Sequence, residues 1–318
     1  MLKTLKSLKA MGLLGINRRN TSYTLKWNDR RFYPLVDDKL QTKRLCEKAG
    51  IPTARLLTVA ERVGDLASLF DELEGHGDFV LKPARGAMGN GILVIKARDG
   101  LKLQKAGGAW IDQEAFIFHA SGIISGLYAL GGRPDVALVE ERLIVHPELA
   151  AICSDGVPDY RVIVFRGVPV MAMVRLPTSV SAGRANLHQG AVGIGVNLAT
   201  CRSSHAVIRS RPTTHHPDTR EPVVDRLIPG FARAVDIAVQ ATDLVHLGYV
   251  GADIVVDATR GPVVLELNAR PGLAIQIANR CGLLPRLNEV ERRWRPGMSL
   301  DDRLALGREI AGRLAPEA

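Results

Sequence analysis

The sequence predicts an α+β fold in which paired strands and separate helices build more than one lobe. Two strand pairs, over 159–175 and over 250–268, each join apolar runs across a short turn. Apolar residues at helical spacing over 37–49 and 229–247 predict two helices, and Asp38 is placed to cap the first. The 318 residues are enough for two or three lobes with cores of their own.

The composition is that of a soluble globular protein. Apolar residues make up 46% of the chain and charged residues 24%. No uninterrupted apolar run approaches the roughly 20 residues that span a bilayer, and no signal peptide is visible at the start. Four cysteines stand far apart in no metal-ligand spacing, so we expect free thiols in a reducing cytoplasm: Cys46, Cys153, Cys201 and Cys281.

The net charge of +9 is concentrated near the two ends of the chain. Much of it lies in the first 31 residues and in 286–295. Aromatic residues are only 5% and do not alternate with basic ones, which argues against a nucleic-acid partner. Residues 1–20 alternate leucine and lysine and predict a short basic amphipathic helix. That helix either attaches to an anionic membrane surface at the inner face of the membrane, or to a partner protein of that membrane, or it packs on the body, and packing is favoured slightly.

The remaining elements follow from apolar pattern and from glycine and proline positions. We expect an extended arm over 17–31, a helix over 58–74, a strand over 78–83, a glycine-rich turn over 84–91 and a return strand over 92–96. Later in the chain we expect a strand over 135–145, a polar loop over 184–190, a mobile loop over 209–222 whose two histidines face solvent, a helix over 272–280, a basic linker over 285–297 and a helix over 300–314.

Three polar residues interrupt the strand pair over 250–268. Glu266 and Asn268 are two residues apart, so they share one face of their strand, and pairing could bring Asp253 beside them. Three oxygen donors without histidine or cysteine suit Mg²⁺ or Mn²⁺ better than zinc. The alternative is that Glu266 and Asn268 are polar residues at a strand edge, which is less favoured because such residues are poor strand formers.

The strand, glycine-rich turn and return strand over 78–96 predict a flap. Its glycines let backbone N–H groups approach an anion, and Lys82 adds a positive charge beside them. No Walker motif is present, so this is not a strand-to-helix phosphate loop. A glycine-rich hairpin alone is a weak signal, and its weight depends on the residues that follow it.

The order of these pieces along the chain resembles the ATP-grasp superfamily. Asp38-Lys39 is followed by V-L-K-P at 80–83, the flap at 85–91, V-E-E-R-L at 139–143, D-Y-R at 159–161, R-A-N-L-H-Q-G-A at 184–191 and the Asp253, Glu266 and Asn268 set. Within the superfamily the chain is most similar to alpha-L-glutamate ligase-like proteins, relatives of the ligases that add glutamate to ribosomal proteins. The resemblance covers roughly residues 30–282.

The resemblance implies an ATP-grasp fold in which two α+β lobes clamp the nucleotide. It implies a basic N-terminal helix and arm at 1–36, lobe A with the flap at 37–140, lobe B with the metal site at 141–283, and a C-terminal linker and helix at 284–318. A reduced N-terminal region is expected in place of the full domain that commonly precedes lobe A. That domain often shapes the acceptor pocket, so the N-terminal arm or a partner chain is expected to replace it.

The same resemblance assigns roles to individual residues. It implies phosphate contacts from Lys39 and Lys82, and a flap formed by Gly86, Met88, Gly89, Asn90 and Gly91. It also implies an adenine hinge formed by Glu140, Glu141, Arg142 and Leu143, and a ribose-binding acid, Glu148. It implies Mg²⁺ or Mn²⁺ held by Asp253, Glu266 and Asn268. Catalytic groups would be Arg161, Arg184, His188 and Arg270, and the acidic substrate and acceptor would meet Arg175, Arg184, Asn186, His188 and Arg270. Arg175 could instead be a surface salt-bridge partner, and His188 a proton acceptor or a plain hydrogen bonder.

The expected activity is that of an ATP-dependent carboxylate–amine ligase acting through an acyl phosphate. It would add glutamate or another amino acid to a peptide or amino-acid acceptor, and a homo-oligomer is expected. Two alternatives stay open: an ATP-grasp phosphotransferase with a non-carboxylate acceptor, and a nucleotide-binding adaptor of a membrane-associated complex.

Overall fold

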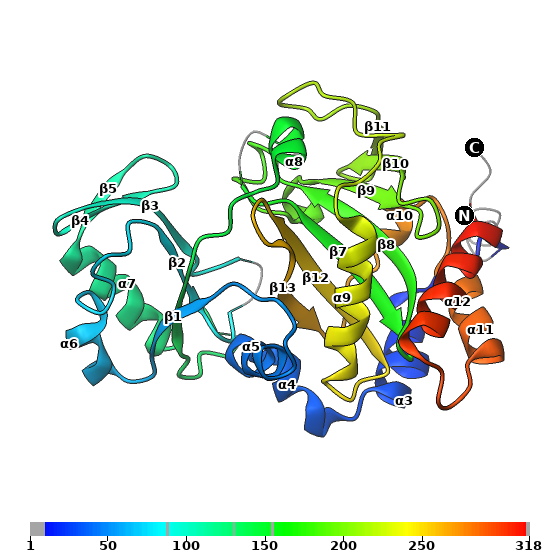
Figure 1. Ribbon diagram of the computed structural model, residues 1–318, viewed down its shortest axis with the longest axis horizontal. Coiled ribbons are helices and arrows are strands. Elements are labelled where there is room, and N and C mark those ends of the chain that lie inside the picture. The colour runs from blue at the N-terminus through cyan, green and yellow to red at the C-terminus, as the bar shows by residue number, and fades with distance from the viewer. Residues whose placement is uncertain (1–9, 87–88, 130, 154–155, 316–318) are drawn as a thin grey trace. The chain divides into compact units, whose positions relative to one another are not determined.

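The computed structural model describes residues 10–86, 89–129, 131–153 and 156–315 (Figure 1). The chain forms two compact units. Unit 1 comprises Met1–Asp37, Arg44–Pro52 and Val145–Ala318, and unit 2 comprises Asp38–Lys43 and Thr53–Ile144. Each unit is built on one antiparallel sheet with helices packed on it, so the predicted α+β class is confirmed.

Unit 2 contains a six-stranded sheet in the order β1-β6-β2-β3-β4-β5. Its core includes Phe70, Phe79 and Phe116, whose rings meet edge to face with centroids 5.8–6.0 Å apart. The elements are β1 (Leu56–Ala60), α6 (Leu66–Leu69), β2 (Phe79–Pro83), β3 (Leu93–Asp99), β4 (Lys102–Lys105), β5 (Trp110–Asp112), α7 (Gln113–Ile124) and β6 (Ala137–Glu140).

Unit 1 contains a seven-stranded sheet in the order β11-β10-β9-β8-β7-β12-β13. Its strands are β7 (Asp159–Phe165), β8 (Val168–Leu176), β9 (Val192–Val196), β10 (Ser203–Ile208), β11 (Arg211–Thr213), β12 (Tyr249–Asp257) and β13 (Gly261–Asn268). Its helices include α2 (Ile16–Arg18), a π-helical turn (Arg19–Thr24), α3 (Leu25–Trp27), α4 (Pro34–Asp37), α8 (Pro147–Ile152), α9 (Phe231–Asp243), α10 (Ile275–Ala278), α11 (Leu284–Arg293) and α12 (Leu300–Arg313); α5 (Lys39–Lys48) continues from unit 2. None of the helices in the described part of the chain is long and apolar enough to cross a membrane.

The two faces of the unit 1 sheet bury different side chains. Alternate residues of β7 and β12, such as Val162 and Ile254, face one core together with Phe231 and other residues of α9. Because successive side chains on a strand point to opposite faces, Arg161 and Asp253 point to the other side. On that side lies a second core. The helices α10 and α11 help to cover it, together with residues 10–37, which we call the N-terminal segment.

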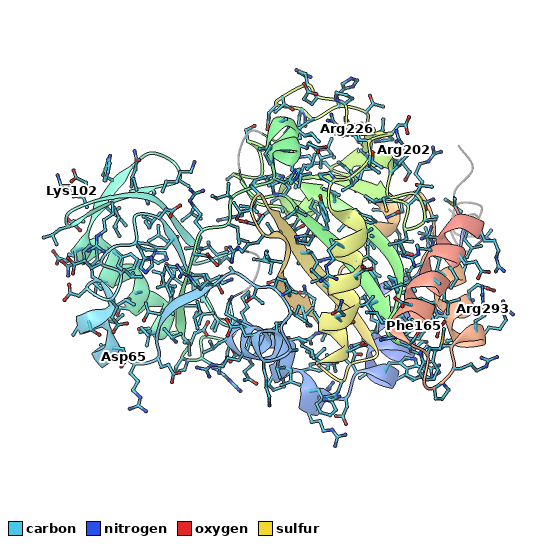
Figure 2. All side chains as sticks on the ribbon, in the orientation of Figure 1. Asp65, Lys102, Phe165, Arg202, Arg226 and Arg293 are labelled. Atoms are coloured by element: carbon cyan, nitrogen blue, oxygen red, sulfur yellow. The ribbon has the colours of Figure 1, made fainter. Side chains whose placement is uncertain are left out.

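The N-terminal segment is helical and docked, so the predicted extended arm over 17–31 is wrong. The ring of Tyr23 meets Phe165 with centroids 5.5 Å apart, and Trp27 meets the same ring at 5.7 Å. Phe165 is the last residue of β7 and is buried in the second core of unit 1 (Figure 2). The predicted amphipathic helix over 1–20 lies partly outside the described residues.

Two further elements differ from expectation. The helix predicted over 58–74 is wrong at its start, because Leu56–Ala60 forms β1 and pairs with β6, so a neighbouring strand overrides the local helical pattern. Within the predicted range a 3-10 turn (Val63–Asp65) and α6 are helical. The basic linker predicted over 285–297 is wrong as well, because Leu284–Arg293 forms α11 and buries Leu287 and Val290 against the second core. The predicted strands over 159–175 and 250–268 and the helix over 300–314 are confirmed.

Candidate active site

Four neighbouring strands of unit 1 place polar side chains on one face of the sheet. The register pairs Asp253 of β12 with Glu266 of β13 on one side and with Arg161 of β7 on the other. Asn268 follows on β13, two residues after Glu266. The expected juxtaposition of Asp253, Glu266 and Asn268 is therefore present, with Arg161 directly beside it.

Two arginines bind the central carboxylate of this group. Arg161 donates from Nε to Asp253 Oδ1 at 2.6 Å and also from Nη2 to Oδ2. Arg175 donates from Nη2 to Asp253 Oδ2 at 2.8 Å and from Nε to Asp159 Oδ1 at 2.5 Å. Asp253 is 1% exposed and Asp159 is 3% exposed, so these are buried ion pairs. Arg175 is therefore no surface salt-bridge partner.

The shared arginines shift the pKa values of the two aspartates in opposite directions. Burial opposes ionisation of Asp253, but the charges of Arg161 and Arg175 outweigh it and hold the pKa of Asp253 well below its usual range. Burial and repulsion from Asp253 raise the pKa of Asp159 to about 6, against the opposing charge of Arg175. Asp253 is therefore the ionised centre of the cluster.

The donor set fits a hard divalent cation. Asn268 Nδ2 lies 3.4 Å from both Glu266 Oε1 and Asp253 Oδ2, so the three side chains converge. Three carboxylates, those of Asp159, Asp253 and Glu266, stand against two guanidiniums, which leaves one excess negative charge when all are ionised. Carboxylate and amide oxygens are the ligands that Mg²⁺ prefers. Because both oxygens of Asp253 already bind arginines, Glu266 and Asn268 are the donors best placed for a metal, with Asp253 beside them.

The polar loop over 184–190 folds over the same face of the sheet. Leu187 packs on Gly193 of β9, where an added Cβ would lie 2.6 Å from the Leu187 side chain, and Gly193 is paired with Arg175. Asn186 Oδ1 accepts from the His188 N–H at 3.0 Å, and His188 and Arg184 are exposed. Within the described residues, no contact joins these side chains to Arg161 or Asp253.

The predicted loop over 209–222 is anchored to the residues that follow β8. His216 is fully buried and its Nε2 lies 2.9 Å from the carbonyl of Pro177, so the expectation that both histidines face solvent is wrong for His216. Asp218 accepts from the N–H and the hydroxyl of Ser179 at 2.8 and 2.7 Å.

Two other predicted site residues of unit 1 lie on its surface. Arg270 is exposed, with its guanidinium 5.2 Å above the ring of Tyr33 and 3.7 Å from Asp37. Glu148 is exposed in the first turn of α8.

In unit 2 a buried carboxylate joins two lysines. Glu140 lies at the end of β6, 2.7 Å from Lys82 Nζ and 3.1 Å from Lys43 Nζ, and all three residues are at most 6% exposed. Burial raises the pKa of Glu140, but the charges of Lys82 and Lys43 outweigh that effect and hold it below its usual value. Two cations on one anion leave a local excess of positive charge, which favours an anionic ligand nearby.

The ends of the glycine-rich flap are tied to the rest of unit 2. Lys39 Nζ donates to the carbonyl of Gly86 at 2.7 Å. At the other end His119 Nε2 lies 3.0 Å from the carbonyl of Gly91, whose φ of 76° is left-handed. Gly89 is left-handed as well and Asn90 is exposed, whereas Met88 lies outside the described residues.

The predicted adenine hinge begins at Glu140, the last residue of β6, and continues through Leu143. Glu141 exchanges hydrogen bonds with the backbone of Arg55, including an N–H bond to the Arg55 carbonyl at 3.0 Å. Arg142 binds Asp78 at 2.7 Å, and Leu143 is buried. The side chains of Glu141 and Arg142 therefore have partners within unit 2.

The sequence matches the model of the sugar-transfer associated ATP-grasp family over residues 18–292. The chain belongs to this family. The expected ATP-grasp superfamily and fold are thereby confirmed, whereas the glutamate-ligase-like subfamily stays a prediction. No curated protein matches the sequence.

Solved structures similar to this ATP-grasp protein include two ligases. The ATP-grasp ligase PsnB, complexed with minimal precursor, has 18% identity and a TM-score of 0.45, and the match covers 88% of this chain and 64% of PsnB. D-alanine–D-alanine ligase from Bacillus anthracis, complexed with ATP, has 14% identity and a TM-score of 0.45, and the match covers 89% of this chain and 68% of that one. The chain thus spans about two thirds of the length of these ligases.

Two buried residues of this ATP-grasp protein were not singled out from the sequence. Lys43 follows Lys39 by four residues, so one helical turn separates them, and that spacing was a usable signal. Asp159 stands two residues before Arg161 in D-Y-R, and its role depends on the register that pairs it with Arg175. The role of Asp159 therefore becomes visible only once its partner strand is known.

Proposed function

We propose that the protein is an ATP-dependent carboxylate–amine ligase that acts through an acyl phosphate. The observation that carries the proposal is the convergence of Asp253, Glu266 and Asn268 with Arg161 and Arg175 on one sheet face of an ATP-grasp protein. The proposal extends to the finer assignments, namely the nucleotide contacts of Lys39, Lys82 and the flap.

The reaction needs a carboxylate to be made electrophilic. A carboxylate oxygen attacks the γ-phosphorus and ADP leaves; the amine then attacks the acyl carbon, phosphate leaves with that oxygen, and the amine loses a proton. Mg²⁺ held by Glu266 and Asn268 would neutralise charge on the β- and γ-phosphates. Arg161, held in place by Asp253, supplies fixed positive charge at the same face, and loss of one such group commonly costs ~10²–10³ in rate.

The proposed acid is glutamate or another amino acid, and the proposed acceptor is an amino acid or peptide. The support is the set of exposed cationic and polar groups on unit 1, because Arg184 and Arg270 are exposed and suit a carboxylate. Exposed His188 in the same loop as Arg184 could accept the amine proton.

The test is release of ADP and phosphate with ATP, Mg²⁺ and pooled amino acids or peptides. Hydroxylamine separates ligation from phosphoryl transfer to another acceptor, because only an acyl phosphate gives a hydroxamate. ADP release without hydroxamate would favour the phosphotransferase. Normal nucleotide binding with no ADP under any substrate combination would favour the adaptor.

Lys82→Met is expected to weaken nucleotide binding by roughly tenfold to a hundredfold, since a hydrogen bond from a charged group contributes about 1.5–3 kcal/mol. Lys43 still neutralises Glu140 in this variant, so we expect the fold to persist. Isothermal titration calorimetry with ADP and Mg²⁺ measures the change in nucleotide affinity. Lys102→Met is the matched control, because Lys102 is an exposed lysine of the same unit (Figure 2). Equal affinities of the two variants would show that Lys82 does not contact the nucleotide.

A further inference from the structure

The N-terminal segment of unit 1 makes polar contacts with the turn that follows β13. This turn comprises Ala269, Arg270 and Pro271 and begins directly after Asn268. Three different parts of the N-terminal segment contact it, through Arg19, through Asn28 and through the Tyr33–Asp37 stretch.

Asn28 ties this turn to the start of β12. Its Nδ2 donates to the carbonyl of Tyr249 at 2.8 Å and to the carbonyl of Ala269 at 2.9 Å, and its Oδ1 accepts from the Tyr249 N–H at 2.9 Å. Asn28 is 2% exposed, so these bonds are shielded from water. The Asn28 carboxamide thus satisfies both backbone groups of Tyr249 and also binds the carbonyl of the residue that follows β13.

Arg19 binds the next two carbonyls of the turn. Its Nη1 donates to Pro271 O at 2.9 Å and to Arg270 O at 3.3 Å, while Asn20 Oδ1 accepts from Nη2 at 2.7 Å and from Nε at 3.0 Å. Asn20 therefore holds the guanidinium in the orientation that reaches the turn. The turn itself lies close on β12, because a Cβ added at Gly251 would be 2.7 Å from Pro271.

The N-terminal segment is itself fixed on unit 1 at its other end. Leu14 is 2% exposed; its N–H donates to Gln276 Oε1 at 2.8 Å, and Gln276 Nε2 donates to the Leu14 carbonyl at 3.1 Å. A segment held at Leu14 and Tyr23 gives Arg19 a defined place between two fixed points.

We infer that Arg19 and Asn28 are positioning residues that set the backbone after β13 and thereby the placement of Asn268 and Arg270. The inference rests on the proposed metal role of Asn268. Groups that orient metal ligands commonly affect metal affinity 10–100-fold. The chain thus uses its own N-terminal segment to hold the end of the strand that carries two candidate metal ligands.

The test compares Arg19→Gln with Arg18→Gln, which removes the same charge from the adjacent, exposed arginine. Mn²⁺ binding is followed by electron paramagnetic resonance in the presence of a non-hydrolysable ATP analogue, and Tm is measured for both variants. Arg19→Gln is expected to weaken Mn²⁺ binding about tenfold, with Arg18→Gln unchanged and Arg19→Lys partly restored.

Three outcomes are decisive. Unchanged Mn²⁺ affinity in Arg19→Gln, or equal losses in both glutamine variants, overturns the positioning role and leaves the proposed function standing. Failure of the wild-type protein to bind Mn²⁺ with the nucleotide analogue instead removes the proposed metal site, and the positioning role with it.

Discussion

Glu266→Gln is expected to lower turnover by ~10²–10³ while the protein keeps its fold. Glu266 is a partly exposed carboxylate whose strand partner, Asp253, is committed to two arginines. Glutamine keeps the size of the side chain and removes the negative charge that a metal ion requires. The rate of ADP release under saturating ATP and Mg²⁺ is the measurement.

Glu221→Gln is the matched control, because Glu221 is exposed in the same unit and its nearest charged partner, Arg226, is 3.6 Å away. Circular dichroism and Tm show whether each variant is folded. A Glu266→Gln protein with wild-type turnover would contradict the metal role, and an unfolded one would give Glu266 a structural role instead.

Asp253→Asn is expected to reduce the free energy of unfolding by about 3–5 kcal/mol, the usual cost of removing one partner from a buried ion pair. Arg175 retains Asp159, but Arg161 loses the carboxylate that accepts from its Nε and Nη2. Urea unfolding of the purified variant measures the change.

The control for this second variant is Asp225→Asn, whose carboxylate pairs with Arg202 at the surface of unit 1 (Figure 2). The Asp225 side chain is 87% exposed, so its loss should cost less than about 1 kcal/mol. Similar costs for the two variants would mean that the Asp253 cluster contributes no more than a surface salt bridge.

The strands that carry the metal-ligand candidates could be predicted because their pattern is local. Glu266 and Asn268 interrupt an apolar run at a spacing of two, and the hairpin turn expected at 257–261 predicts an antiparallel partner for Asp253. The arginine pairing of Asp253 could not be predicted, since it depends on β7 and β8 joining the sheet in a particular register. For Lys43 the spacing of four residues from Lys39 was a usable signal, but its pairing with the buried Glu140 could not be predicted.

Errors in the predicted elements have a common physical cause. The stretch 58–74 has helical spacing of apolar residues, yet Leu56–Ala60 becomes a strand because β6 offers a hydrogen-bonding partner. The stretches 17–31 and 285–297 are basic and polar, yet each forms a helix because a few apolar residues, Tyr23 in one and Leu287 in the other, find a core. Tertiary packing decides such segments, and composition alone does not.

The most direct test of the ligase mechanism is transfer of ¹⁸O from a labelled carboxylate to inorganic phosphate. The acid that supports ADP release is prepared with ¹⁸O in both carboxylate oxygens and incubated with ATP, Mg²⁺ and the amine acceptor, and the phosphate is analysed by mass spectrometry. An acyl-phosphate mechanism places one ¹⁸O atom in each phosphate released. Unlabelled phosphate, formed at the same rate as ADP and amide product, would contradict it.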